Sequence, residues 1–270
     1  MRAAVASVWA VIVTIGFVQV ANGLQTSVLG VRSGIEAFPP WTFGIIMASY
    51  YVGYSTAPLT SRRIIGRFGH VRTMTVGVVV AALMIAAAGY LVTPLAWGLL
   101  RAVSGFALSS LYVGAESWIH DRVANAQRGR VLSIYMVMQM IAMTGAQFLL
   151  GAGDPASPSL FLLPGVLFAV SCLPVLYARR SAPDHAPPEP FGMLRLFAAA
   201  PLGTIETFLA GVSWSIVFTF GPVYARSYRF DLFQVSVFMA LAMAGGVRVQ
   251  FPIACLSDAA GARGTRALDA

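Results

Sequence analysis

Long apolar stretches alternate with short polar connectors along most of the 270 residues. Windows of about 19 residues separate eight such stretches, each near the roughly 20 residues that a helix needs to cross the hydrocarbon core of a bilayer. The pattern therefore predicts an all-α, polytopic membrane protein. The predicted spans are 4–30, 42–60, 73–92, 95–117, 131–151, 159–178, 198–221 and 233–254.

The connectors divide the chain into unequal parts. The two best marked connectors cover residues 61–72 and 119–130, whereas the segment 179–197 is longer and rich in Pro. We therefore expect a six-helix unit, a linker, two further helices and a tail. In residue numbers these parts are 1–178, 179–197, 198–254 and 255–270.

Charge supports a membrane location and gives an orientation. Only 10% of the residues are charged, against roughly 25% in ordinary soluble domains, so a soluble globular protein is excluded. All 18 basic residues are Arg; with alternating connectors, thirteen fall on the side of the amino terminus, three on the other side and two within spans. The positive-inside rule then predicts a cytoplasmic amino terminus. Because the arginines are scattered between spans, the net charge of +8 does not indicate a nucleic-acid partner.

Residues that usually signal catalysis or metal binding form no recognisable cluster. Cys172 and Cys255 lie in or beside apolar segments without a CxxC spacing, and His70, His120 and His185 all fall in connectors. The sequence contains no glycine-rich nucleotide loop and no nucleophile next to a base. These observations favour a protein that is not an enzyme and has neither a metal site nor a bound cofactor.

The connector after the second span carries a motif. Residues 62–72 read RRIIGRFGHVR, which resembles the loop signature G-x-L-x-D-R-x-G-R-R of the major facilitator superfamily. Arg67 and Gly69 match its R-x-G core, while Gly66 stands where the acidic residue is expected and Arg62 replaces the first glycine. The resemblance is therefore partial at this loop.

Two further segments extend the resemblance. Arg101 and Gly105 are similar to the R-x-x-x-G pattern of the family's fourth helix, and Asp258 and Gly261 belong to a second, incomplete copy of the loop signature. Two loop signatures one six-helix repeat apart are typical of transporters built from two halves. The segment 114–118, GAESW, together with the loop Gly-His, resembles an uncharacterised bacterial branch grouped with sugar and drug transporters.

The resemblance implies a fold and a function. The expected fold is a helical bundle of the major facilitator type, with a complete six-helix first half and about two helices of the second. The expected function is secondary active transport of a small solute across the bacterial inner membrane by alternating access, with proton coupling as an option. Because twelve spans need about 380 residues, we expect a truncated or frame-shifted product. The alternative is a non-transporting remnant, or a membrane scaffold or sensor partner.

Ionisable residues inside spans are candidates for function, because charge in hydrocarbon is costly. Arg101 lies about 9 Å inside the fourth span, and we expect it to face a cavity. There it either anchors an anionic group or ties the helix to neighbouring carbonyls. Glu206 in the seventh span is a candidate for proton coupling, the alternative being a carboxyl neutralised by a helix partner, and Arg248 is expected to reach the interface.

Polar side chains in the spans suggest a solute pathway and a gate. Gln19, Asn22 and Thr26 share one helix face and suit either a hydrogen-bonding solute or contacts between helices, and Gln139 and three tyrosines of the second span have the same two interpretations. Arginines of the loop signature are expected to pair with carboxylates when the cytoplasmic side is closed. The expected gate residues are Arg67, Gly69, Arg72, Glu116, Asp121, Asp258 and Gly261.

Overall fold

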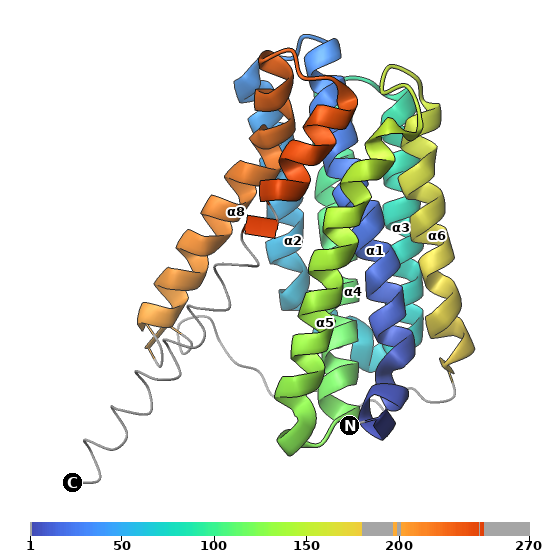
Figure 1. Cartoon of the computed structure of the whole chain (residues 1–270). Helices are drawn as coiled ribbons and strands as arrows, with labels where there is room; N and C mark the ends of the chain where they lie inside the picture. Colours follow the sequence, from blue (N-terminus) through green and yellow to red (C-terminus); the bar gives the residue numbers. More distant parts are fainter. Residues whose placement is uncertain (1, 180–196, 199–200, 243, 246–270) are drawn as a thin grey trace, which may run out of the picture.

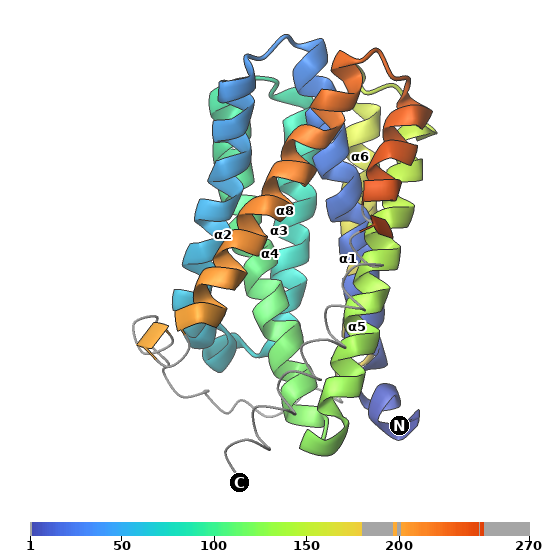
Figure 2. The ribbon, with the colours of Figure 1, turned by 60° about the vertical axis from the view of Figure 1, so that its left-hand side comes forward.

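The computed structural model describes residues 2–179, 197–198, 201–242 and 244–245. The described residues form long helices that run roughly along one axis (Figures 1 and 2). The helices are α1 Arg2–Ile35, α2 Pro40–Phe68, α3 His70–Tyr90, α4 Pro94–Arg122, α5 Asn125–Ala146, α6 Ser159–Tyr177, α8 Pro201–Ser227 and a last helix Leu232–Ala242; a short 3₁₀ helix, η1 Gln147–Ala152, follows α5.

The predicted spans correspond to these helices. Six of the described helices are long and apolar enough to cross a membrane, and they match predicted spans one and three to seven. Helix α2 has 29 residues but is more polar, so it is not among those six. For the predicted span 233–254, the described part is the helix Leu232–Ala242, and the remainder lies outside the described residues, as does most of the linker 179–197.

The two best marked connectors are shorter than predicted. Residues 61–68 continue α2, and the chain turns at Gly69, whose φ of 82° is in the left-handed region that glycine adopts without strain. Likewise α4 continues to Arg122 before α5 begins at Asn125. Polar and basic residues end the apolar run but do not end a helix, because backbone hydrogen bonding continues into the polar zone of the bilayer.

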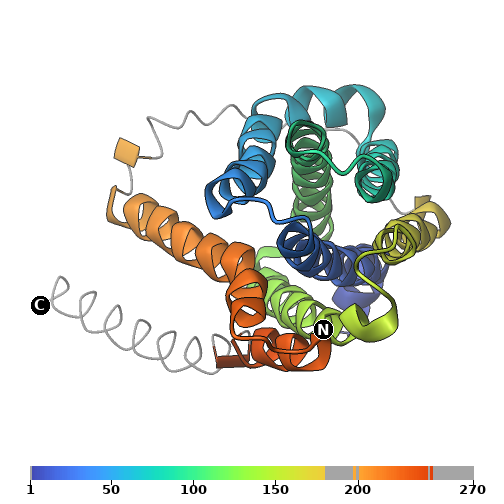
Figure 3. The same cartoon turned by 90° about the horizontal axis from the view of Figure 1, so that it is seen from above.

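Helix α1 is the centre of the bundle. It packs against α4, α5, α6 and α8, and in the view along the bundle it lies among them (Figure 3). Its buried apolar side chains form one continuous cluster with those of α3, α4 and α6. Two glycines face α5: an added Cβ on Gly23 would lie 3.0 Å from the Cβ of Ala146, and one on Gly16 would lie 2.8 Å from the sulfur of Met138. Small residues thus let α5 approach α1 closely.

The α3–α4 connection is pinned at one end of the bundle. Thr93 caps α4 by accepting a hydrogen bond from the backbone N–H of Ala96, and Pro94 occupies the first turn. The indole N–H of Trp97 donates to the carbonyl of Ala88 at 2.9 Å. This buried bond fixes the register of α4 against α3.

Helices α2 and α4 touch through their backbones. A Cβ on Gly105 would fall against the carbonyl oxygen of Tyr50 and 3.1 Å from the amide nitrogen of Tyr54, and a Cβ on Gly53 would fall against the carbonyl oxygen of Ala102. Glycine at both positions is therefore required for this crossing. Gly105 is the glycine of the R-x-x-x-G motif, so the motif has a packing role besides its arginine.

Helix α8 contacts the bundle of the first six helices through its second half. Its second half contacts α1, where an added Cβ on Gly30 would lie 3.1 Å from the Cβ of Pro222, and α2, where a Cβ on Gly44 would lie 3.4 Å from the ring of Phe220. Its first half is mostly exposed and leans away from the bundle toward the end that carries the amino terminus (Figures 1 and 3).

The backbone contact between α2 and α4 predicts a strong effect of a single methyl group. Gly105→Ala is expected to lower the free energy of unfolding by about 1–3 kcal/mol, the range for overpacked sites, because the added Cβ meets backbone that cannot move aside. Gly98→Ala on the same helix is the matched control, since the nearest atom to its Cβ, the hydroxyl of Ser49, lies 3.9 Å away. Unfolding in detergent micelles measures both; equal stability of the two variants would contradict the assigned contact.

Candidate functional site

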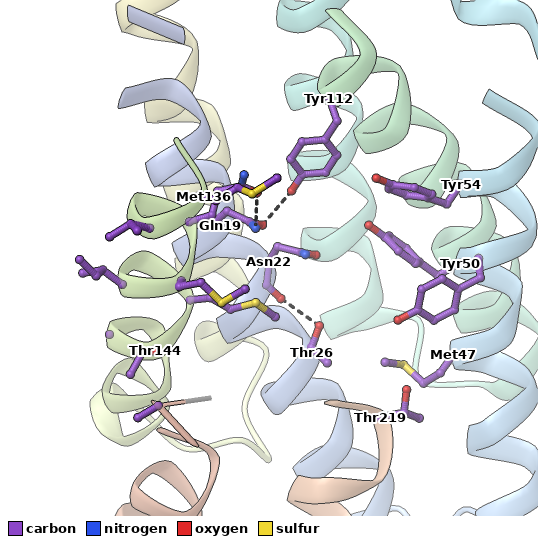
Figure 4. A pocket seen from close by; sticks show the side chains of 18 of the residues that line it. Gln19, Asn22, Thr26, Met47, Tyr50, Tyr54, Tyr112, Met136, Thr144 and Thr219 are labelled. Carbon is purple, nitrogen blue, oxygen red and sulfur yellow. Dashed lines mark hydrogen bonds between the residues drawn. The ribbon is translucent and has the colours of Figure 1, made fainter. Parts of the chain in front are cut away.

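A cavity of about 1170 Å³ lies between α1, α2, α4, α5 and α8. Figure 4 shows α1 passing through the middle of this region, with tyrosines of α2 on one side and α5 on the other. Thr219 of α8 lines the cavity near the end where α8 meets the bundle, while Glu116 and Ser133 line it toward the opposite end. α8 therefore borders the cavity at the end where it meets the bundle, and it leans away from the bundle toward the end with the amino terminus (Figure 1).

The predicted polar face of α1 lines this cavity. Gln19, Asn22 and Thr26 all contribute to its surface (Figure 4). Thr26 donates to the carbonyl of Asn22 at 2.9 Å, and the amide oxygen of Asn22 accepts from Gln25 at 2.7 Å. The side chains of this face therefore line the cavity, and Asn22 and Thr26 also form hydrogen bonds within α1.

Gln19 joins three helices. The phenol of Tyr112 on α4 donates to the amide oxygen of Gln19 at 2.8 Å, and the amide N–H of Gln19 donates to the amide oxygen of Gln139 on α5, also at 2.8 Å. All three side chains line the cavity. This chain of bonds fixes the distance between α4 and α5 across α1, at the level where the cavity is polar.

Arg101 lies on α4 against the α2 tyrosines. Its side chain is 6% exposed and contributes to the cavity lining, and its guanidinium carbon stands 4.2 Å from the ring centroid of Tyr50. The ring of Tyr50 also contacts two neighbouring tyrosine rings: its centroid lies 5.3 Å from that of Tyr51, edge to face, and 5.8 Å from that of Tyr54. The structure thus places Arg101 in the cavity lining, as expected, next to the ring of Tyr50, which also lines the cavity.

The α5 wall of the cavity is rich in methionine. Met136, Met140 and Met143 repeat along one face of α5, and Met47 of α2 also lines the cavity. Neither these methionines nor Tyr112 was among the residues predicted from the sequence. The spacing of the three α5 methionines, at i, i+4 and i+7, is the signal that was available.

The predicted gate residues are only partly brought together. His70, the first residue of α3, has its Nε2 atom 3.1 Å from the hydroxyl of Ser117 and 3.9 Å from a carboxylate oxygen of Asp121. Arg67 instead stacks over the ring of Phe68 at 5.5 Å, and Arg72 is exposed. Asp258 and Gly261 lie outside the described residues.

The expected pairing of Glu116 with a loop arginine is not present in the described structure. Glu116 lies one helical turn after Tyr112, on the same face of α4, and therefore lines the cavity. Arg67 and Arg72 lie outside that lining.

Glu206 and Arg248 do not enter the described site. Glu206 lies in the second turn of α8, exposed and outside the cavity lining, and Arg248 lies outside the described residues. Among the described carboxylates, Glu116 is the one that lines the cavity. Proton coupling through Glu206 stays a prediction, and the cavity position of Glu116 makes it a second candidate.

One comparison decides the family. A model of the Major Facilitator Superfamily matches residues 3–268. The chain belongs to this superfamily. Similar curated proteins are uncharacterised transporters of the same type: one from Enterobacter sp. strain 638 is 24% identical over 228 residues, one from Yersinia pestis 26% over 227, and YcaD of Escherichia coli 25% over 228.

These relatives are longer than the chain. Each alignment covers 83% of this chain and 59% of the relative, so the chain spans about six-tenths of their length. The fold is similar to that in the crystal structure of the nucleoside transporter NupG, with a TM-score of 0.75 and 16% sequence identity. The structural alignment covers 93% of this chain and 67% of the NupG chain. The comparison confirms the predicted all-α bundle of this superfamily, in a multi-pass bacterial membrane protein.

The three-helix bond chain through Gln19 predicts coupling between two substitutions. Tyr112→Phe and Gln19→Leu each break the same 2.8 Å bond, so the double variant is expected to lose less stability than the sum of the singles, by about 0.5–1.5 kcal/mol. Unfolding of all four proteins in the same detergent measures this difference. Strictly additive losses would show that the phenol and the amide do not bond in the folded chain.

Proposed function

We propose that the chain works as a secondary active transporter, moving a small solute across the bacterial inner membrane by alternating access. The observation that carries the proposal is the arrangement of α8 around the cavity. At one end α8 packs against Gly30 of α1 and Gly44 of α2, and its Thr219 lines the cavity there; at the other end α8 leans away from the bundle. A solute could thus enter from one side while the opposite side stays sealed.

The contacts of α8 are suited to reversible opening. α8 packs on α1 through Pro222, which lies against Gly30 with Val223 nearby, and on α2 through the ring of Phe220 near Gly44. Small apolar contacts of this kind separate without leaving buried polar groups unsatisfied. If α8 rocked so that these contacts separated while its first half moved onto the bundle, the cavity would open at the end near Gly30 and close at the end with the amino terminus.

The proposed orientation places the open end in the cytoplasm. The connectors on the amino-terminal side hold thirteen of the 18 arginines, which by the positive-inside rule belong in the cytoplasm. The cavity in this structure is then inward-facing. The lining of amides, hydroxyls and aromatic rings suits a solute that is recognised by hydrogen bonds and stacking.

Transport is tested in proteoliposomes that contain the purified chain. We expect saturable uptake of at least one solute from a panel of labelled nucleosides, sugars, amino acids and organic acids, compared with empty liposomes. Gly30→Trp is expected to reduce this uptake at least tenfold, because the indole would hold α8 away from α1 and prevent closure. Gly98→Ala, which lies outside the cavity lining, is the control that keeps the rate.

Failure of every solute to enter, with a chain that elutes as a folded species, would contradict transport by this chain. Uptake that is equal for Gly30→Trp and the unchanged chain would contradict the proposed closure at α8, even if transport itself occurs.

The orientation is tested by cysteine labelling in spheroplasts. After Cys172 and Cys255 are replaced by Ser, Ala37→Cys, in the exposed turn between α1 and α2, should react with a membrane-impermeant maleimide. Gln127→Cys, exposed near the start of α5, should react only after permeabilisation. The reverse result would place the amino terminus outside.

A further inference from the structure

Arg101 is a buried cation whose donors are not satisfied. Its Nε and Nη1 atoms have no hydrogen-bond partner among the described residues, and no described carboxylate stands within ion-pair distance of its guanidinium. Leaving a buried charge without a counter-ion costs several kcal/mol in a medium of low dielectric. An arrangement of this kind is stable in a binding site, where a ligand completes it.

The contact with Tyr50 orients the guanidinium but does not satisfy it. The guanidinium carbon lies over the Tyr50 ring, 4.2 Å from the ring centroid. The N–H donors of a guanidinium point outward in its own plane, and an aromatic ring supplies no oxygen or nitrogen atom that could accept from them. They therefore stay available for an acceptor that approaches edge-on, as a carboxylate does when it accepts two parallel bonds.

The chain's own cavity carboxylate cannot be that acceptor. Glu116 is fifteen residues further along the same helix, which separates the two side chains by roughly 22 Å at 1.5 Å per residue. The two groups thus stand at different depths of the cavity. Among the described residues no carboxylate is left for Arg101, and a ligand in the cavity can supply the acceptor.

The rest of the lining indicates what the acceptor is attached to. Beyond Arg101 the cavity is bounded by the rings of Tyr50, Tyr51 and Tyr54 and by the methionines of α5. Aromatic rings and thioethers bind apolar and aromatic groups through dispersion and stacking. A ligand that contacts both regions has an anionic end and an apolar or aromatic body.

We propose that Arg101 is the anion-binding residue of a subsite for organic carboxylates, with the body of the solute on the tyrosine and methionine surfaces. This proposal rests on the proposed transport function, because it names the class of solute for the same cavity. It differs from what the name of NupG states for that protein, whose nucleoside solutes carry no carboxylate.

Binding is measured on the purified 270-residue chain in detergent by ligand-induced thermal stabilisation, followed by isothermal titration of the compounds that stabilise it. The probes are matched pairs at millimolar concentration, each an aryl or alkyl carboxylate and its uncharged amide, beginning with phenylacetate and phenylacetamide. We expect carboxylates to stabilise the chain and the amides to bind about ten- to hundredfold more weakly, the range for a hydrogen bond to a charged group.

Variants assign the effect to Arg101. Arg101→Gln should lose the preference for the acid over the amide, and Arg101→Lys should weaken acid binding at least severalfold, because a lysine cannot present two parallel donors. Arg229→Gln removes the same charge from an exposed turn and should bind like the unchanged chain. If Arg101→Gln does not fold, the acid–amide comparison on the unchanged chain and the lysine variant still decide.

Three results would overturn the proposal: no carboxylate binds, acids and amides bind equally, or acid binding is unchanged in both Arg101 variants. These outcomes differ from failure of transport, because binding in detergent does not require α8 to move. A chain that binds carboxylates through Arg101 but carries none across liposomes would keep the subsite and reject the transport function.

Discussion

The close approach of α2 to α4 is the constraint on which the cavity depends. Because Gly53 and Gly105 carry no Cβ, the backbones of the two helices touch, and Tyr50 is brought over Arg101 one helical turn before Gly105. A wider crossing would separate the ring from the guanidinium and leave the cation without its orienting contact. The arginine and the glycine of the R-x-x-x-G pattern thus act together: the glycine sets the spacing, and the spacing sets the direction in which the arginine presents its donors.

A second constraint acts through α1, which contacts both walls of the cavity. The bonds from Tyr112 to Gln19 and from Gln19 to Gln139 hold α4 and α5 at a fixed distance, whereas α8 meets α1 and α2 through small apolar contacts. The first six helices therefore form a stiff body. In the proposed transport cycle, motion is expected where α8 meets that body, because its contacts there through Pro222 and Phe220 are apolar.

Helices and their polar faces could be predicted from the sequence, because they depend on regular spacing. Contacts between particular residues of different helices could not. Apolar length predicts the helices, and the loop and fourth-helix motifs indicate the family. The spacing of Gln19, Asn22 and Thr26 predicts a shared polar face, which lines the cavity. Helix ends were misplaced because α2 and α4 continue as helices beyond their apolar runs. Tyr112 and the α5 methionines were missed because such residues on an apolar helix have the same pattern whether they pack or face a cavity. The pairing of Glu116 with a loop arginine, expected when the cytoplasmic side is closed, stays a prediction; in this structure Glu116 lines the cavity.

The methionine wall on α5 has a consequence for selectivity. Thioether side chains are unbranched and have several rotatable bonds, so Met136, Met140 and Met143 can reshape their surface at little energetic cost. The opposite side is stiff, because a stacked guanidinium on a tightly packed helix pair has few alternative positions. A site with one rigid and one deformable side discriminates strictly at the rigid side and tolerates variety at the other. Under the proposed function, the protein would therefore sort its solutes by the chemistry of one end while accepting a range of sizes and outlines at the other.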